Sequence, residues 1–184
     1  MINREKFFNR IRPLFKGKLD AKQVQGITAV LDEWDRRKLK DARHLGYMLA
    51  TDKWETAHTM QPIQELGGLR YLRSKRYWPW IGRGLVQLTW EFNYKKAGDK
   101  IGVDLISDPD KALDVEIAVK IMFDGMIEGW FTGKKLSDYF NASKNDPINA
   151  RRIINGIDKA REIAAIAQAF TVALIEAKEN EDAV

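Results

Sequence analysis

The chain has 184 residues, a formal net charge of +5 and a sequence pI near 9.3. This length fits one domain with a sizeable core, and we expect a single globular domain over residues 1–184. The absence of cysteine excludes a disulfide scaffold and fits synthesis in a reducing cytoplasm. With two histidines and no clustered ligands, we expect no metal and no cofactor. No apolar run approaches the roughly 18 residues of a membrane span, and residues 1–6 lack an apolar signal region.

Basic side chains are concentrated near the N-terminus, where residues 1–40 hold eleven Lys and Arg against five Asp and Glu. A basic surface favours an anionic partner, such as an outer-membrane surface or an acidic polymer, although most charged faces are simply solvated. No nucleic-acid-binding motif is present, so we expect no nucleic-acid partner. We also expect the chain to be a monomer.

Two amphipathic helices are expected at the start of the chain. Asn3 can cap the first, which Pro13 should end or kink. The apolar residues on one face of this helix are Phe7, Phe8, Ile11, Leu14 and Phe15. Asp20 and Gln23 have the spacing of a capping box for the second helix. Its apolar stripe consists of Val24, Ile27, Leu31 and Trp34, and a charged connector follows over residues 35–41.

A third helix is expected over residues 41–58. Its buried positions recur at spacings of three, four and seven, namely Leu45, Met48, Leu49 and Thr56. The helix should end near Met60, because Pro62 disfavours a helical conformation in the residue before it and cannot itself continue a helix.

Glu55 is the first candidate functional residue. At about 100° per residue it falls within about 20° of Met48, so it lies on the buried stripe of this helix. A carboxyl there is either paired with an arginine, such as Arg70 or Arg73, or held partly desolvated. Desolvation raises a carboxyl pKa, which a general acid working near neutral pH needs. Periodicity leaves both interpretations open.

Glu65 is the second candidate. It is expected in a loop just before Gly67 and Gly68, where it can fold back across a cleft. Two carboxyls on opposite walls are what glycoside hydrolysis requires, because one protonates the leaving oxygen and the other activates water. Most loop glutamates are simply solvated, so Glu65 by itself is weak evidence.

Residues 82–90 combine a glycine turn with an alternating pattern. Glycines on both sides of Arg83 predict unusual backbone angles or a close approach of another chain segment. The next residues alternate between an apolar face and a polar face, which predicts a short strand. The apolar residues are Val86, Leu88 and Trp90, and the polar ones are Gln87 and Thr89. An amide beside a hydroxyl suits an amino sugar or a positioned water, although an ordinary edge strand fits the alternation equally well.

Aromatic residues crowd the segment between Gly68 and Gly82. They are Tyr71, Tyr77, Trp78 and Trp80. Aromatic faces stack on sugar rings, so Tyr71 and Trp80 are candidate sugar contacts, while others of the group are expected in the core.

The rest of the chain is expected to be mainly helical. Helices are predicted over residues 93–100, 115–128, 147–154 and 158–178, with Gly129 ending the second of these and Asp146 capping the third. The last helix carries balanced charge nearby, which favours core packing over membrane activity. No repeat, low-complexity tract or Pro/Gly linker divides the chain.

The stretch GRGLVQLTWEFNY, residues 82–94, resembles the signature of glycoside hydrolase family 19. WETAHTMQPIQE, residues 54–65, stands where that family carries His-Glu-Thr followed later by a second Glu. The resemblance covers residues 7 to about 170 and is closest to phage endolysins and chitinase-like muramidases. It implies a mainly α, α+β lysozyme-like fold with a small irregular or β segment at the active-site cleft.

The resemblance also implies roles for named residues. It maps a general acid onto Glu55, a water-activating carboxylate onto Glu65 and a water-positioning hydroxyl onto Thr89, in an inverting mechanism. Further positions are implied as substrate contacts or their neighbours: Gln87 and Asn93 as sugar contacts, Asn155 near the cleft, and Arg161 as the basic residue that orients the second glutamate.

Two departures from the family pattern matter. Trp54 stands where the family has a histidine, so any hydrogen bond from that histidine is missing. The loop between the two acids varies in length across the family, so Gln64 could be the aligned position in place of Glu65.

The expected function is that of an endolysin that hydrolyses the β-1,4-glycosidic bonds of bacterial peptidoglycan and lyses the host cell. We expect it to stay in the host cytoplasm until it is released to the periplasm and cell wall, and to have no separate wall-binding module. Its basic N-terminal region could hold an anionic wall surface. The alternatives are a chitinase, which would use the same residues, and a non-catalytic glycan-binding relative. Trp54 favours the latter, whereas both acids and Thr89 oppose it.

Overall fold

The structure, a computed structural model, describes residues 2–178. Within that range it is mainly helical, as expected, with one small antiparallel sheet. The α-helices are α1 (Arg4–Ile11), α2 (Ala21–Arg36), α3 (Ala42–Glu55), α4 (Leu69–Arg73), α5 (Glu91–Ile101), α6 (Val115–Glu128) and α7 (Ala160–Glu176). Short 3₁₀ helices cover Arg12–Phe15, Pro109–Leu113, Leu136–Asp138 and Asn149–Ile153.

The first two helices begin where the sequence predicts. The Asn3 side chain accepts a backbone hydrogen bond from the first turn of α1, and Asp20 and Gln23 form a complete capping box on α2. α1 ends at Ile11, and Pro13 lies in the 3₁₀ helix that follows. These caps satisfy N–H groups that a helix N-terminus leaves without partners.

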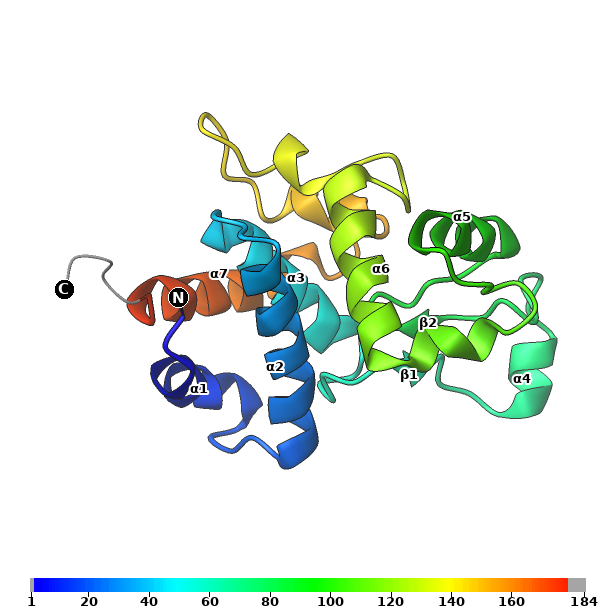
Figure 1. Cartoon of the computed structure of the whole chain (residues 1–184), viewed down its shortest axis with the longest axis horizontal. Helices are drawn as coiled ribbons and strands as arrows, with labels where there is room; N and C mark the ends of the chain where they lie inside the picture. The colour runs from blue at the N-terminus through cyan, green and yellow to red at the C-terminus, as the bar shows by residue number, and fades with distance from the viewer. Residues whose placement is uncertain (1, 179–184) are drawn as a thin grey trace.

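Helices α3 and α7 lie against each other at the centre of the molecule (Figure 1). Gly46 of α3 permits this packing, because a Cβ at that position would lie 2.2 Å from Oγ1 of Thr171 in α7. The hydrophobic core surrounds this pair and also draws on α1, α2, α5 and α6. The polypeptide that carries Glu55 is therefore part of a rigid, buried helix.

The end of α3 differs from the prediction. The helix ends at Glu55 and not near Met60. Ala57, His58 and Met60 have φ values of 50°, 70° and 54°, which are left-handed and interrupt an α-helix. Pro62 sets only the latest point at which the helix can end, so the prediction from it was wrong. Glu55 thus occupies the last helical position.

The sheet consists of β1 (Ile63–Gln64) and β2 (Arg83–Gly84), paired antiparallel with Ile63 opposite Gly84. Gly84 has φ +83°, and a Cβ there would lie 2.9 Å from the carbonyl oxygen of Ala112. The Gly-Arg-Gly turn therefore needs glycine for both its backbone angle and its close packing.

The expected strand over residues 86–90 is wrong. The chain turns after Gly84 and returns as a single bridge between Arg83 and Leu88, with Gln87 at φ 52°. Leu88 is buried as the alternation predicts, whereas Trp90 is 41% exposed. A tight turn shows the same two-residue alternation as a strand over so short a stretch, which explains the error.

The C-terminal half follows the prediction closely, with one exception. α6 has the predicted bounds and ends at Gly129, which has φ +77°. The expected helix over residues 147–154 is wrong, because this segment forms only the 3₁₀ helix Asn149–Ile153. The Asp146 side chain accepts a hydrogen bond from the Asn149 backbone and starts this short turn. α7 begins at Ala160, two residues later than predicted.

Figure 1 shows α1 near one end of the longest axis of the molecule and α4 near the other. Among residues 2–178, no helix has the length and apolar character needed to cross a membrane.

Candidate active site

A cleft of about 380 Å³ lies where the end of α3, the turn before α5, the start of α5 and the loop after residue 153 meet. Its lining includes five of the residues predicted from the sequence, namely Glu55, Gln87, Thr89, Asn93 and Asn155. The apolar part of the lining consists of Val86, Leu88, Trp90, Phe92, Phe131 and Ile154. A cavity of this size with a few convergent polar groups is typical of a small-molecule or glycan site.

Glu55 is paired with a buried arginine. Nη1 of Arg151 donates a hydrogen bond to Oε1 of Glu55 at 2.5 Å, and the side chains of Arg151 and Glu55 are 5% and 15% exposed. Arg151 also donates from Nε to the carbonyl oxygen of Asp158. The partner is thus neither Arg70 nor Arg73. Within residues 2–178, Oε2 of Glu55 has no hydrogen-bond partner and is free to contact a ligand.

Tyr47, two turns before Glu55 on α3, is a buried phenol close enough to this ion pair to respond to both of its charges. Its side chain is fully buried, and its hydroxyl has no partner among the described residues. Burial raises the pKa of the Tyr47 phenol, and the nearby charge of Arg151 opposes that shift. The Arg151 and Glu55 side chains are themselves shielded from most water, so their electrostatic interaction is stronger than it would be in water.

Three polar side chains present acceptor oxygens: Gln87 and Thr89 in the turn before α5, and Asn93 in the first turn of α5. Thr89 donates its hydroxyl proton to the carbonyl oxygen of Gln87 at 2.7 Å, so its oxygen can still accept a hydrogen bond. Asn93 donates from Nδ2 to the carbonyl oxygen of Thr89 at 2.9 Å. Gln87 donates from Nε2 to the carbonyl oxygens of Ile63 and Gly84. These bonds fix the amide orientations and leave the Oδ1 and Oε1 atoms as acceptors.

Glu65 is half-buried and held by two donors. The Tyr77 hydroxyl donates to Oε1 at 2.9 Å, and the Gly82 backbone N–H donates to Oε2 at 3.2 Å. Burial, followed by the bond to Glu65, raises the pKa of Tyr77 to about 12. A Cβ on Gly82 would lie 2.7 Å from Oε1 of Gln87 and 3.4 Å from Cβ of Glu65, so both side chains lie against this glycine. Gln64, the alternative position, is exposed on β1.

The remaining predicted residues lie outside the cleft lining, as does Glu65. Tyr71 is exposed on α4, and Trp80 packs partly buried against the core. Arg161 is exposed at the start of α7 and forms no hydrogen bond with Glu65 in the described part of the chain. The arginine that contacts a predicted catalytic glutamate is therefore Arg151.

Sequence reasoning missed Arg151 and the apolar walls Phe92, Phe131 and Ile154. Arg151 lies four residues before Asn155 in the same short segment, and this proximity was the one available signal. Phe131 reaches the cleft from the loop after α6, and no spacing in the sequence links it to Glu55.

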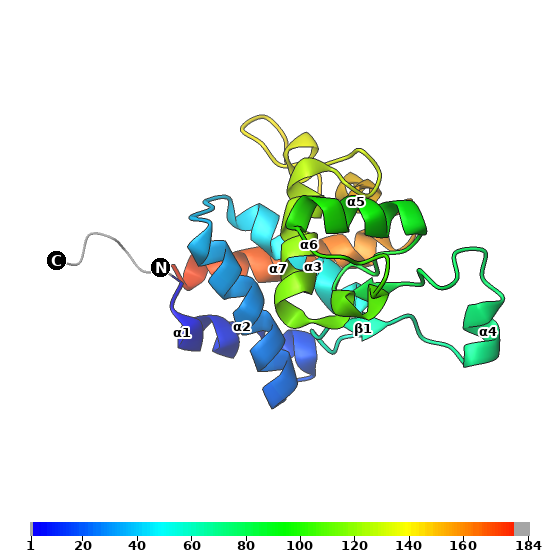
Figure 2. The same ribbon diagram turned by 45° about the vertical axis from the view of Figure 1, so that its right-hand side comes forward.

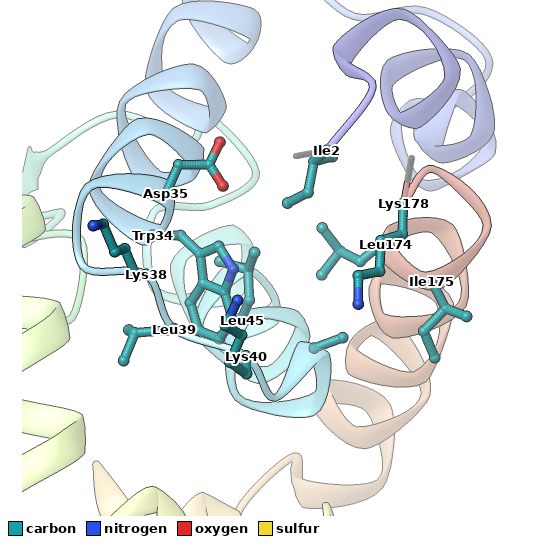
Figure 3. Close-up of a pocket in the computed structure, with 11 residues that line it drawn as sticks. Ile2, Trp34, Asp35, Lys38, Leu39, Lys40, Leu45, Leu174, Ile175 and Lys178 are labelled. Atoms are coloured by element: carbon teal, nitrogen blue, oxygen red, sulfur yellow. The ribbon is translucent and has the colours of Figure 1, made fainter. Parts of the chain in front are cut away.

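A second, more apolar cavity of about 540 Å³ lies between α2, α3 and the end of α7 (Figure 3). None of the predicted site residues lines it. Trp34, Leu39, Leu45 and Leu174 form much of its wall. Among the described residues that line it, Asp35 is the only carboxyl group, and it is ion-paired with Arg4. The described lining therefore lacks the pair of carboxyls needed for glycoside hydrolysis.

Known proteins resemble this chain in the region of the cleft. Chitinase 4 from Oryza sativa subsp. japonica is 38% identical over 96 residues, which cover 47% of this chain and 33% of the rice protein. Endochitinase 1 from Theobroma cacao is 49% identical over 45 residues, which cover 24% of this chain and 14% of the cacao protein. The matched part of the chain thus spans about a third or less of these relatives.

Solved structures share the fold over nearly the whole chain. Chitinase C from Streptomyces griseus HUT6037 aligns with a TM-score of 0.64 and 22% identity, covering 94% of this chain and 92% of that one. A class IV chitinase from Zea mays aligns with a TM-score of 0.56 and 17% identity, covering 92% and 90%. The model of the glycoside hydrolase 19 family, described as chitinase class I, matches residues 43–148, which are more than half of the chain. The chain therefore belongs to glycoside hydrolase family 19.

Proposed function

We propose that the chain is an inverting glycoside hydrolase that cleaves the β-1,4 bonds of bacterial peptidoglycan and acts as an endolysin. One observation carries the proposal: Glu55, held by a buried arginine, faces the same cleft as Thr89 and Asn93 in a family 19 chain. The enzyme would be made in the host cytoplasm and released to the periplasm, and two carboxyl groups suffice for the chemistry without a metal or cofactor.

In this mechanism Glu55 is the general acid. Its Oε1 stays on Arg151, while Oε2 carries the proton to the glycosidic oxygen as the bond breaks. Arg151 keeps the carboxyl in one orientation, which lowers the entropic cost of reaching the transition state. After proton transfer the guanidinium stabilises the carboxylate that remains.

The attacking water lies between Thr89, which lines the cleft, and Glu65, which lies outside the lining but packs against Gly82 beside Gln87. The Thr89 oxygen accepts a hydrogen bond from this water, because its own proton is bound to the Gln87 carbonyl. Glu65 accepts the second proton of the water as general base. A water between acid and base attacks the sugar from the face opposite the leaving group, so the anomeric configuration inverts.

The remaining cleft residues bind the sugars. Oδ1 of Asn93 and Oε1 of Gln87 are acceptors for acetamido N–H groups. Asn155 accepts the Gly156 backbone N–H through Oδ1, which leaves Nδ2 to donate to a sugar oxygen. Trp90 and Phe92, exposed and stacked on each other, offer aromatic faces to a sugar ring.

The second candidate is chitin, a polymer of the same linkage without lactyl or peptide groups. Its support is that the rice, cacao, Streptomyces and maize proteins similar to this chain are all called chitinases. A third candidate is a glycan-binding protein without activity, for which the support is Trp54 at the family's histidine position.

Mass spectrometry of digests tests the three candidates together. Purified peptidoglycan and a chitin oligosaccharide are incubated separately with the enzyme, in the presence of a chelator. Fragments from peptidoglycan support the proposal, and their reducing-end sugar identifies the bond that is cut. Fragments from chitin alone favour the chitinase. No fragments from either substrate, with binding retained, favour the non-catalytic protein.

A further inference from the structure

Residues 66–80, which we call the basic arm, project from the helical body beside the cleft. Figure 2 shows α4 held away from the other helices at the end of two extended connections. The arm contains Arg70, Arg73, Lys75 and Arg76, and the chain has no acidic residue between Glu65 and Glu91. Within residues 2–178, none of these four side chains forms an ion pair. The arm is therefore a concentrated, uncompensated positive charge.

The same arm exposes an unusual amount of apolar and aromatic surface. Leu66, Leu69 and Tyr71 are 72%, 55% and 50% exposed. The Lys75 ammonium lies 3.8 Å from the centre of the Tyr71 ring, and Arg73 lies over Trp78. Leu69, Arg70, Arg73 and Ser74 line a shallow depression on its surface. Cations beside exposed rings suit a ligand that combines carboxylates with sugar or aliphatic surface.

The arm is continuous with the candidate active site. At its base, Tyr77 donates to Glu65, and the Tyr77 ring packs edge-on against Trp90 with centroids 5.2 Å apart. Trp90 in turn lines the cleft. The backbone N–H of Trp90 donates to the Trp80 carbonyl at 2.9 Å, which ties the far end of the arm to the same turn. A polymer that leaves the cleft past Trp90 meets the arm next.

From this placement we propose that the basic arm binds the carboxylates of an anionic glycan held in the cleft, and so selects peptidoglycan over a neutral polymer. Peptidoglycan carries lactyl and peptide carboxylates, whereas chitin carries none. The inference rests on the proposed function, because it takes the cleft to be the glycan site. It assigns specificity to Arg70, Arg73, Lys75 and Arg76, which lie outside the cleft.

Four exposed lysines outside the cleft lining provide a matched control. Lys38, Lys40 and Lys178 line the second cavity, Lys120 lies on α6, and none of the four forms an ion pair among residues 2–178. Neutralising these four lysines changes the net charge as much as neutralising the arm. A glycan strand in the cleft should feel only the arm, because charges separated by more than about 10 Å are screened at 0.1 M salt.

The experiment measures binding by titration calorimetry in the Glu55→Gln background, so that the affinity is measured separately from cleavage of the ligand. The ligands are soluble glycan strands that keep their peptides and a neutral N-acetylglucosamine oligosaccharide. One variant changes Arg70, Arg73, Lys75 and Arg76 to Gln, and the control changes Lys38, Lys40, Lys120 and Lys178 to Gln. A third variant, with Arg70, Arg73 and Arg76 changed to Lys, keeps the arm's charge.

We expect the neutral arm variant to bind the anionic strands at least about fivefold more weakly at 0.1 M salt, and the loss to vanish near 1 M. Its affinity for the neutral oligosaccharide should stay close to that of the parent. The control variant and the lysine-for-arginine variant should bind both ligands about as tightly as the parent does. A salt series on the parent protein measures the same electrostatic contribution to the affinity for the anionic strands, without any substitution in the arm.

Equal affinity of the arm variant and the parent for the anionic strands would overturn the proposal, as would an equal loss on both ligands. Loss of binding to anionic phospholipid vesicles, with glycan binding intact, would assign the arm to a membrane and also overturn it. Failure of the proposed function is seen separately, as absence of peptidoglycan fragments in the wild-type digest.

Discussion

Glu55 combines two properties that the sequence presents as alternatives, since it is both ion-paired and turned toward a cleft. The pairing has a consequence for mutagenesis. Arg151 is almost fully buried, so removing the charge of Glu55 leaves a buried cation without a counterion. Breaking one side of a buried ion pair is strongly destabilising, although an amide at position 55 can still accept the hydrogen bond.

We therefore predict that Glu55→Gln lowers both activity and stability. Loss of general acid catalysis should reduce the rate about 10²–10⁴-fold. The unfolding free energy should fall by roughly 1–3 kcal/mol, because a charge-assisted bond becomes a neutral one. Turbidity clearing of peptidoglycan and urea denaturation check the two effects.

The matched control is Glu176→Gln, which removes a glutamate from the exposed pair with Arg10. Its activity and unfolding midpoint should stay close to wild type. If Glu55→Gln keeps more than roughly a tenth of wild-type clearing under folding conditions, Glu55 is not the general acid.

Stereochemistry tests the roles of Glu65 and Thr89. A water held between two carboxyls requires them to lie roughly 6.5–9.5 Å apart and gives the α-anomer as first product. We expect NMR to detect the α-anomer immediately after cleavage of a soluble oligosaccharide. Thr89→Val should slow this reaction roughly tenfold or more by removing a hydrogen bond to the water, and Thr89→Ser should largely restore it. A β-anomer as first product would rule out the inverting mechanism.

At the scale of elements, α3 carries a second carboxyl group besides Glu55, and this one is buried without an ion-pair partner among the described residues. Asp52 is fully buried, and Thr56 donates to its Oδ1 at 3.3 Å while Oδ2 has no partner among the described residues. Burial raises the pKa of Asp52 to about 8, and the bond from Thr56 opposes the rise. Burial of this carboxyl therefore favours its protonated form in the central helix.

We predict that Asp52→Asn stabilises the protein increasingly as the pH rises. In the unfolded chain this carboxyl titrates near pH 4, so between about pH 4 and 8 the native state holds a proton that the unfolded state has released. The unfolding free energy of the wild type should fall over that range, by at most about 1.4 kcal/mol per pH unit from this group. Asparagine stays neutral and avoids this loss.

Urea denaturation of both proteins at pH 5, 6, 7 and 8 measures the difference. Asp99→Asn, a change at an exposed position of α5, should give a curve parallel to wild type. A constant difference between Asp52→Asn and wild type across the series would mean that Asp52 is ionised in the native protein.

At the scale of the whole molecule, positive charge gathers at two ends with different expected roles. The N-terminal basic residues lie outside the cleft lining. Two of them are neutralised, because Arg4 pairs with Asp32 and Asp35, and Arg10 pairs with Glu176. Lys6, Lys16, Lys18 and Lys22 remain exposed and can hold the enzyme on an anionic wall.

We predict that changing these four lysines to Glu weakens binding to whole sacculi at 0.1 M salt and leaves cleavage of a soluble oligosaccharide intact. The effect should disappear near 1 M salt, where the Debye length is about 3 Å. Sedimentation with purified sacculi measures it. A control with Lys111, Lys120, Lys134 and Lys135 changed to Glu matches the charge. Equal retention of the N-terminal variant and wild type at low salt would mean that α1 only packs against the core.

Local rules predicted the elements of this fold whose causes lie within a few residues. The Asn3 cap, the Asp20–Gln23 capping box and the Gly129 stop of α6 each depend on neighbours in the chain, so they can be read in the sequence. The signature over residues 82–94 likewise pointed to Gln87, Thr89 and Asn93, which the structure brings into one cleft with Glu55.

Only the tertiary structure decided what meets those residues. Arg151 is 96 positions from Glu55, and no local preference links them until α3 and the 3₁₀ segment before α7 pack together. The same holds for residues 86–90, where a bridge from Leu88 back to Arg83 makes a turn from a pattern that also fits a strand. The spacing of apolar residues indicates which face of a helix or strand is buried. Contacts between side chains distant in sequence depend on how the complete fold packs.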